Sequence, residues 1–446
     1  MQLLNSLIAF IFTIGILVAV HEFGHFWVAK KLGIKVLRFS LGFGKVLKSW
    51  QLGETTYTIC ALPLGGFVKM LDENEGQVSE SEKHRAFNRQ NVYKRIAVVV
   101  AGPAANFILA VVLYSVVFML GTPGIKAQIG VLENGGIADN SGLQIGDKLL
   151  SVNGKQTLSI AEFIGQFLPA ANQENLSLKA LSKTGELKTL KLNLSGDFLA
   201  NPQQGVEKYL GFEFAYPAFK PIIDKVLPNK SAHLAGLKTG DEILKANNKP
   251  VKTWRNFVAV IKQNPNQKVD LQILRSGKLI NLSLTPKIEN GISKAGISLK
   301  VPENYLDGWR VETRKSPLDA FISANVKVYQ FSVLNLIIIK KMLIGEASLK
   351  QISGPISIAD YAGKTAETGL VAFLSFLALI SIGLGLLNLL PIPLLDGGHL
   401  FFYLIEIIKG SQVRQSTQQI FMKFGILLIF SLMVLAIYND TLRLLS

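Results

Sequence analysis

The segment Leu3–Ala29, LLNSLIAFIFTIGILVAVHEFGHFWVA, decides the class of fold of this chain. It contains no Asp, Glu, Lys or Arg before Glu22, and it is longer than the roughly 20 residues with which an α-helix crosses a bilayer. It lacks the basic start and the small-residue cleavage pattern of a secretory signal peptide. We therefore expect this segment to be retained as a membrane-spanning helix.

Three further segments are apolar and long enough to span a membrane: Ile96–Leu120, Gly369–Leu395 and Phe421–Ile437. Of the 446 residues, 49% are hydrophobic and 17% are charged, whereas soluble domains carry about 25% charged residues. This composition excludes an ordinary soluble enzyme. The sequence predicts a polytopic α-helical membrane protein with four transmembrane helices, which lie within residues 1–121 and 350–446.

The positive charge of the chain indicates how these helices are oriented. The net charge is +16, and many basic residues lie between the first two apolar segments, from Lys30 to Arg95. Basic residues beside membrane helices mark the cytoplasmic side, so we expect both termini and residues 122–316 on the periplasmic side of a bacterial inner membrane. Topology explains this charge, and no pattern of aromatic and basic residues accompanies it, so we expect no nucleic-acid partner.

The single cysteine, Cys60, permits no intrachain disulfide.

An internal repeat between residues 122 and 305 predicts tandem domains. The stretch GLQIGD, which begins at Gly142, recurs as GLKTGD from Gly236, 94 positions later. The same offset relates two further pairs of residues, Asn153 with Asn247 and Phe163 with Phe257. Short apolar runs between glycine turns predict two small β-rich domains, at 122–220 and 221–305, with the loop-rich stretch Asp197–Pro221 as a linker.

Residues 34–71 predict a β-structure close to the membrane. Alternating and β-branched residues favour strands at Val36–Phe43 and Thr55–Met70. An open strand edge can bind an extended peptide by β-augmentation, and Gly65 and Gly66 are candidate substrate-binding residues there. A soluble hairpin with a purely structural role is the alternative.

Residues 316–349 predict one more apolar helix, with Ser316 as its N-cap and Pro317 in its first turn. About a dozen residues separate Lys327 from Lys340, too few to span a bilayer. We expect an amphipathic helix on the membrane surface. Packing of this helix against the periplasmic domains is the alternative.

The chemistry of the chain centres on His21-Glu-Phe-Gly-His25, at the end of the first apolar segment. On a helix, residues four apart lie on one face, about 6 Å apart along the axis. Two imidazoles in that arrangement can bind one Zn²⁺, and Glu22 between them can accept a proton from water. Ionisable residues at membrane depth usually have a function. Helix packing through a satisfied pair of histidines is the alternative.

A catalytic zinc needs a third protein ligand. Asp396 ends the third apolar segment, and the predicted topology brings it to the membrane depth of His21 and His25. His399 is the alternative third ligand. A structural role for Asp396 at a helix end or turn is the remaining alternative.

These motifs together resemble one known family. His21-Glu-x-x-His25 and Asn388-x-x-Pro-x-Pro-x-Leu-Asp-Gly397 resemble the motifs of the site-2 protease family of intramembrane zinc metalloproteases. Two PDZ-like repeats between the second and third membrane helices strengthen the resemblance. Gly102-Pro-Ala-Ala-Asn106 also matches a pattern of this family; helix packing explains it best, and a role for Asn106 behind the metal ligands is a further possibility.

The resemblance implies a site and a substrate. It implies one catalytic Zn²⁺ held by His21, His25 and Asp396, with Glu22 as acid and base. It implies that the substrate is a transmembrane segment of an anti-sigma factor already trimmed by a first protease, or a signal-peptide remnant, met in the lipid bilayer. It implies that the PDZ-like repeats act as a periplasmic filter, while binding of C-termini by these repeats stays open. The residues implied to handle the substrate are Asn388, Pro391 and Pro393.

Two other classes of function compete with a protease. The first is a metal transporter that uses the same three ligands, and the second is a PDZ-type membrane scaffold without chemistry. Neither gives Glu22 a special role, so replacement of Glu22 separates them from the protease hypothesis.

Overall fold

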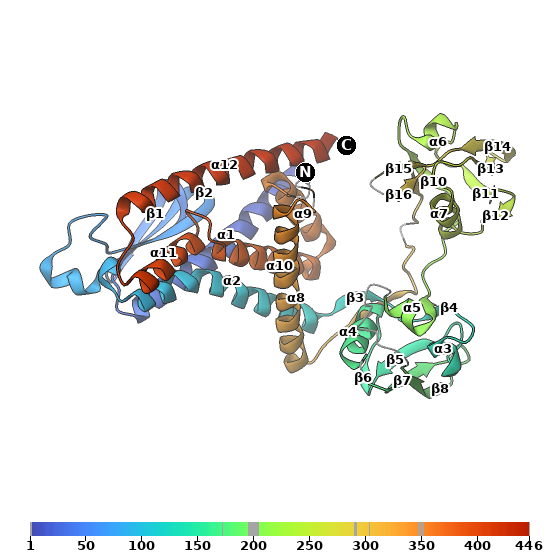
Figure 1. The fold of residues 1–446 in the computed structure, drawn as a ribbon, viewed down its shortest axis with the longest axis horizontal. Coiled ribbons are helices and arrows are strands. Elements are labelled where there is room, and N and C mark those ends of the chain that lie inside the picture. Colours follow the sequence, from blue (N-terminus) through green and yellow to red (C-terminus); the bar gives the residue numbers. More distant parts are fainter. Residues whose placement is uncertain are drawn as a thin grey trace. The chain divides into compact units, whose positions relative to one another are not determined.

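The computed structural model describes residues 2–171, 173–194, 205–289, 292–302, 304–346, 348 and 352–445. The chain divides into two compact units (Figure 1). The first unit joins Met1–Thr122 with Arg314–Ser446, and the second is Pro123–Thr313. The first unit contains the helices that bear the histidine motif and Asp396.

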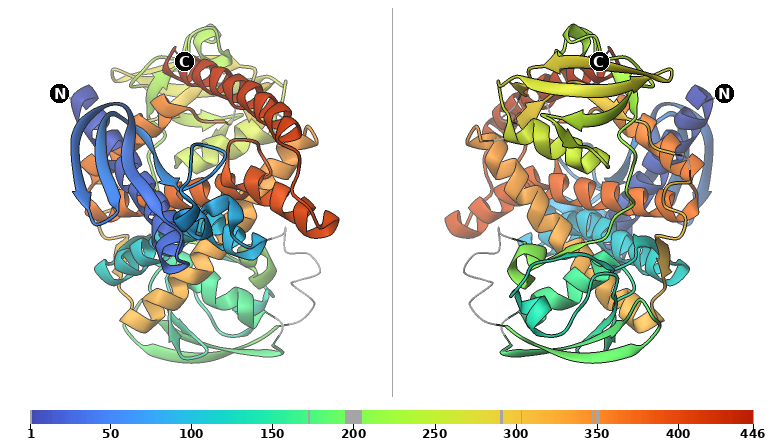
Figure 2. Two further views of the ribbon diagram at one scale, coloured as in Figure 1. Left: turned by 90° about the vertical axis from the view of Figure 1, so that its left-hand side faces the viewer. Right: turned by 90° about the vertical axis from the view of Figure 1, so that its right-hand side faces the viewer.

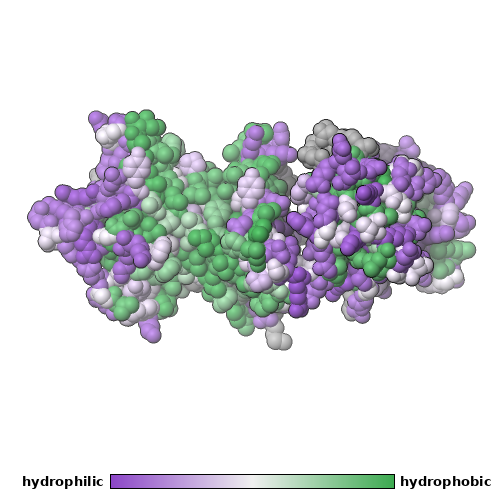
Figure 3. All heavy atoms as spheres, turned by 90° about the horizontal axis from the view of Figure 1, so that it is seen from below, coloured by the Kyte–Doolittle hydropathy of each residue, from purple (hydrophilic) through white to green (hydrophobic). Residues whose placement is uncertain are grey.

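Helices dominate the first unit. Five of the described helices have the length and apolar composition to cross a membrane: α1, α2, α8, α10 and α12. Four of them overlap the segments predicted to span, and the fifth, α8, is the helix predicted to lie on the membrane surface; its placement stays a prediction. Apolar residues gather over the middle of this unit, and hydrophilic residues gather at the end formed by the segment 72–91 (Figure 3). The helices are α1 (Gln2–Lys31), α2 (Val92–Leu120), α8 (Pro317–Leu343), α9 (Pro355–Thr368), α10 (Leu370–Leu389), α11 (Asp396–Lys409) and α12 (Gln415–Leu445), with 3-10 turns η1 (Glu80–Arg85) and η2 (Phe87–Arg89) before α2.

The third predicted segment, Gly369–Leu395, extends too far. Helix α10 ends at Leu389, just before Pro391 and Pro393. Proline lacks the amide hydrogen that continues a helix, and it disfavours helical geometry in the residue before it. A second helix, α11, then begins at Asp396 itself. The sequence analysis missed α11 as a separate element.

Small side chains let α2 pack closely against its neighbours. Ala110, Ala324 and Ala378 are fully buried where α2, α8 and α10 meet. The ring of Tyr114 stacks on Phe331 of α8, with 6.4 Å between ring centroids. Small residues of this kind favour close helix approach in membrane proteins.

A long antiparallel hairpin lies beside α1 (Figure 2). Strands β1 (Val36–Leu52) and β2 (Thr55–Met70) meet at Leu52 and Thr55. Both predicted strands are present, and β1 continues well beyond the predicted end at Phe43. Phe39 pairs with both Tyr57 and Val68, so the hairpin folds back on itself, and all three pack on Phe26 of α1. Leu47 and Leu52 are each 66% exposed.

The second unit contains the sequence repeat as two copies of one sheet topology. Each copy has four strands in corresponding order, β6-β5-β7-β8 and β12-β11-β13-β14. Asn153 and Asn247 both adopt φ 48°, and their side-chain oxygens accept the amides of Ser177 and Asp270 at 2.9 and 3.0 Å. The strands and helices of the sheets are β5 (Lys148–Val152), β6 (Lys155–Gln156), α4 (Ile160–Ala170), β7 (Asn175–Leu181), β8 (Leu187–Asn193), β11 (Glu242–Ala246), β12 (Lys249–Pro250), α7 (Trp254–Gln263), β13 (Val269–Arg275) and β14 (Lys278–Leu284).

Shorter elements complete this unit. They are β3 (Thr122–Ile125), β4 (Ile129–Leu132), α3 (Ile137–Asn140), α5 (Val206–Leu210), β9 (Phe212–Phe214), β10 (Ile223–Val226), α6 (Ser231–Leu234), β15 (Lys287–Glu289), β16 (Ile292–Lys294), β17 (Ile297–Leu299) and β18 (Arg310–Thr313). The assignment of the two copies as PDZ-like domains, and their exact limits, stay predictions.

Part of the predicted linker Asp197–Pro221 belongs to a folded core. Residues 197–204 lie outside the described residues, but β9 pairs with β4. Phe212 and Phe214 are buried and contact the ring of Phe163. The loop-rich composition misled the prediction because these two aromatic residues complete the apolar core of the first copy.

Candidate metal centre

Helix α1 and the first residue of α11 form a cluster of three metal-binding side chains. His21 Nε2 lies 3.2 Å from His25 Nε2. Asp396 Oδ2 lies 3.1 Å from His21 Nε2, and Asp396 Oδ1 lies 3.5 Å from His25 Nε2. Among the described residues, these three form the cluster of histidine, cysteine and carboxylate groups able to hold a metal ion. His399 is not part of it.

The separations of the donor atoms fit a tetrahedral zinc ion. Bonds of about 2.0–2.1 Å at tetrahedral angles place neighbouring ligand atoms about 3.3 Å apart. The His21–His25 separation of 3.2 Å and the 3.1 Å between His21 and Asp396 Oδ2 lie near that value, while His25 faces the other carboxylate oxygen, Oδ1, at 3.5 Å. Two imidazoles and one carboxylate are also a common ligand set of catalytic zinc, which keeps its fourth position open.

The other nitrogens of both imidazoles face polar groups on α2. His25 Nδ1 lies 2.8 Å from the carbonyl oxygen of Val98, so it carries the hydrogen and leaves Nε2 free for a metal. His21 Nδ1 lies 3.1 Å from the Asn106 amide, whose oxygen is buried without a hydrogen-bond partner. Rotating this amide by 180° brings that oxygen to His21 Nδ1. Each imidazole is then held in place by a hydrogen bond from its Nδ1, the nitrogen that does not face the metal site, as in most protein metal sites.

Glycines allow α1, α2 and the hairpin to approach the cluster closely. A side chain at Gly102 of α2 would overlap the imidazole of His25, and one at Gly66 of β2 would lie 3.0 Å from Glu22 Cγ. Gly102 thus has a steric role, next to the packing role that its motif predicts. Glu22 lies between the ligands in sequence and close to β2 in space.

We expect Gly102→Ala to weaken zinc binding at least about tenfold, the loss typical when the support of a metal ligand is disturbed. The added methyl group displaces the His25 imidazole, while alanine itself favours the helix. Zinc affinity of the purified protein, measured by competition with a chromogenic chelator, tests this expectation. Gly383→Ala in α10 is the matched control, because nothing lies within 4 Å of its added Cβ. Equal zinc affinity in the two variants would refute the steric role.

The cluster opens into a cleft of about 690 Å³. Asn388 reaches the cluster, with its Nδ2 3.5 Å from His21 Nε2. The cleft continues past the cluster toward polar residues that include Asp72, Asn88 and Gln412. Predicted site residues that line it besides the three ligands are Glu22, Gly65, Gly66, Asn388 and His399.

Pro391 and Pro393 are absent from the described lining of the cleft. Pro393 is instead packed against Gly425 of α12, where an added Cβ would clash with it. The two prolines shape the connection that leads to Asp396, and a direct contact with substrate stays a prediction.

Two functional features escaped the sequence analysis. The Val98 carbonyl carries no residue-type signal, so no motif could have revealed it. Arg95 and Glu406 form an ion pair of 2.5 Å between α2 and α11, whereas the sequence predicts Arg95 only as a basic residue of the cytoplasmic loop. No local signal could have paired the two residues, because 311 positions separate them in the sequence.

Comparison with known proteins assigns the chain to a family. The sequence profile described as peptidase family M50 matches residues 9–432. The chain belongs to peptidase family M50. This is the site-2 protease family that the two motifs resemble, so the predicted family is confirmed, as is the activity of a zinc metalloprotease.

Full-length relatives support the same assignment. The regulator of sigma-E protease RseP of Escherichia coli is 38% identical over 454 residues, which cover 100% of both chains. The regulator of sigma E protease of Haemophilus influenzae is 38% identical over 449 residues, again covering 100% of both. A relative from Vibrio cholerae whose assigned name is zinc metalloprotease is 39% identical, covering 99% of this chain and 100% of its own. This M50 peptidase is therefore a multi-pass membrane enzyme of regulated intramembrane proteolysis.

One solved structure matches part of the chain. The PDZ domain of an SdrC-like protein from Listeria monocytogenes is 18% identical and covers 20% of this chain and 92% of its own, with a TM-score of 0.17. A score of that size carries no argument about the fold.

Proposed function

We propose that His21, His25 and Asp396 hold the catalytic zinc of this M50 peptidase and that Glu22 is its general acid and base. The observation that carries the proposal is the convergence of three donor atoms, from segments over 370 positions apart in sequence, to within 4.8 Å. Glu22 lines the same cleft and is not one of the ligands. Three protein ligands are the usual number for one catalytic zinc ion, so we propose that the site binds a single ion.

Different residues of the cleft have different roles in peptide hydrolysis. Zinc, when bound, supplies a Lewis acid that acidifies water and polarises the scissile carbonyl. Glu22 accepts the proton from the attacking water and later gives it to the leaving amine. Asn388 hydrogen-bonds the substrate backbone beside His21. The polar end of the cleft admits the water that hydrolysis consumes.

A transmembrane helix must unwind before it can be cut, because its amides are held in internal hydrogen bonds. We propose that the unwound segment pairs with the edge of β2 at Gly65 and Gly66, by β-augmentation. Side chains are missing at both positions, so the substrate backbone can come close to Glu22. Pro391 and Pro393 end α10, and the residues before Asp396 form a tight turn instead of an extended stretch: the Leu395 amide donates to the Ile392 carbonyl oxygen at 3.2 Å, and Leu394 adopts φ 75°.

The relatives support a proposal for the substrate class. RseP of E. coli is named a regulator of sigma-E protease, and we propose a corresponding role here: cleavage of an anti-sigma factor after a first protease has removed its outer domain. Signal-peptide remnants are a second substrate of the same kind. The cleft then faces the cytoplasmic side of the inner membrane, and the PDZ-like domains and both termini are periplasmic. The PDZ-like domains exclude substrates that are still bulky.

Purified protein in liposomes, given zinc and a single-pass reporter, tests the proposal. We expect cleavage within the reporter's transmembrane segment, loss of cleavage with a zinc chelator, and recovery when zinc is restored. A matched reporter with a folded periplasmic domain should be cut at least about tenfold more slowly. Zinc flux without cleavage would favour a transporter, binding of the reporter without either would favour a scaffold, and both results would refute the protease.

A further inference from the structure

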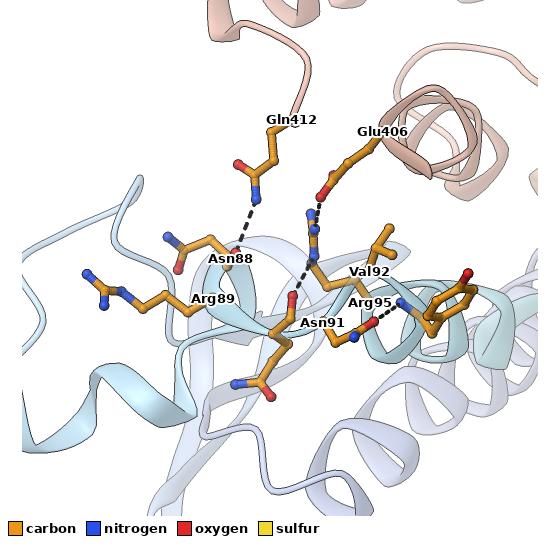
Figure 4. Close-up of a pocket in the computed structure, with 9 residues that line it drawn as sticks. Asn88, Arg89, Asn91, Val92, Arg95, Glu406 and Gln412 are labelled. Carbon is orange, nitrogen blue, oxygen red and sulfur yellow. Dashed lines mark hydrogen bonds and ion pairs between the residues drawn. The ribbon is translucent and has the colours of Figure 1, made fainter. Parts of the chain in front are cut away.

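A buried ion pair joins α11, the helix that supplies Asp396, to α2, the helix that packs against α1 and its two histidines. Arg95 of α2 and Glu406 of α11 approach to 2.5 Å, with 7% and 16% of their side chains exposed. Arg95 also donates from Nε to the Gln90 carbonyl oxygen at 3.1 Å. Its guanidinium lies 4.9 Å from the centre of the Tyr403 ring, also on α11. Figure 4 shows the two side chains meeting directly, and both line a pocket.

The pair is connected to the metal cluster along both helices. On α2, Arg95 precedes Val98, the residue whose carbonyl oxygen orients His25, by one helical turn. On α11, Glu406 follows Asp396, the first residue of the helix, by about 15 Å at 1.5 Å per residue. One ion pair therefore joins the helix that supports His25 to the helix that supplies Asp396.

The two ends of α11 are held in different ways. At its start, Gly397 and Gly398 pack directly against the backbone of Leu390 and Ile392. Those contacts belong to the same local connection, so they do not fix α11 relative to α2. Near its far end, the ion pair with Arg95 and the packing of Tyr403, which is 8% exposed, make that connection.

We infer that Arg95 and Glu406 are positioning residues: they hold α11 against α2 so that the Asp396 carboxylate stays at ligand distance from His21 and His25. The inference rests on the proposed metal site. Neither residue touches the ligands. Removing one partner leaves a buried charge without compensation, and α11 then shifts until that charge is solvated, which withdraws Asp396 from the imidazoles.

The experiment uses the full chain carrying Glu22→Gln, so that zinc binding is measured apart from cleavage. The variants are Arg95→Met, Glu406→Gln and the exchanged pair Arg95→Glu with Glu406→Arg. Zinc affinity is measured by chelator competition, and the ligand geometry by the visible absorption of the Co²⁺-loaded protein. We expect each single variant to bind zinc about 10- to 100-fold more weakly with an altered Co²⁺ spectrum, and the exchanged pair to recover most of both.

Glu73→Gln is the matched control, since Glu73 pairs with Arg89 at 2.6 Å in the segment before α2 but contacts no residue of α11 in the described structure. We expect its zinc affinity and Co²⁺ spectrum to equal those of the parent. If the Arg95→Met protein does not fold, the exchanged pair decides: a folded exchanged pair with parental zinc affinity supports positioning, and one without it overturns positioning.

The outcomes separate this inference from the proposed function. Folded single variants with parental zinc affinity and spectrum overturn the positioning role, even if the wild-type protein cleaves its reporter. A wild-type protein that binds zinc at this cluster but cleaves nothing overturns the proposed function and leaves the positioning role standing.

Discussion

Glu22→Gln is expected to lower the rate of reporter cleavage by about 10²- to 10⁴-fold, the contribution usual for a general acid–base group, while zinc stays bound. Glutamine matches glutamate in shape but cannot accept the proton of the attacking water. The ligands are untouched, because Glu22 is not part of the cluster formed by His21, His25 and Asp396. The loss should therefore appear in the turnover rate and not in the metal content.

Cleavage and zinc content are measured on one sample of Glu22→Gln. Glu54→Gln is the matched control, since Glu54 is an exposed carboxylate that pairs with Arg85 at 2.6 Å and does not line the cleft in the described structure. Its cleavage rate should equal that of the wild type. Cleavage by Glu22→Gln at the wild-type rate would remove Glu22 from the mechanism.

Asp396→Asn should weaken zinc binding by at least about 100-fold. Replacing a residue that only hydrogen-bonds a metal ligand typically weakens metal binding about 10- to 100-fold, and Asp396 is itself a proposed ligand. Asparagine keeps the size of the side chain but removes the negative charge that the zinc ligand supplies. The Asp396 oxygens lie 3.1 and 3.5 Å from the two imidazole nitrogens, so the change acts directly at the cluster. Cleavage should fall with the metal content.

His399→Ala is the matched variant for Asp396→Asn. His399 lines the cleft, but it is outside the metal-binding cluster of the described residues. We expect this variant to keep its zinc at wild-type affinity. Full zinc occupancy in Asp396→Asn together with loss in His399→Ala would move the third ligand to His399.

Local patterns revealed much of the fold because each depends on near neighbours in sequence. Apolar runs predicted four of the five helices that could span a membrane, and the alternation within Val36–Phe43 and Thr55–Met70 predicted both strands of the hairpin. The 94-residue offset predicted two copies of one topology, which the sheet orders and the shared asparagine geometry bear out. These signals fail where a composition is ambiguous, as at Phe212 and Phe214, whose core position depends on Phe163 in another element.

Sequence by itself determined that two imidazoles share one face of the first helix with a glutamate between them, because helical periodicity fixes that arrangement within five residues. It also placed Asp396 at the same depth, through the charge pattern of the loops. Only the tertiary structure decided which side chain completes the cluster and what holds it there. The break at Pro391 turns Asp396 into the start of α11. The Val98 carbonyl oxygen and the Asn106 amide, both on α2, contact His25 and His21, and the Arg95–Glu406 pair joins α2 to α11. Such contacts join positions hundreds of residues apart, and their distances depend on the packing of whole helices, which no local pattern encodes.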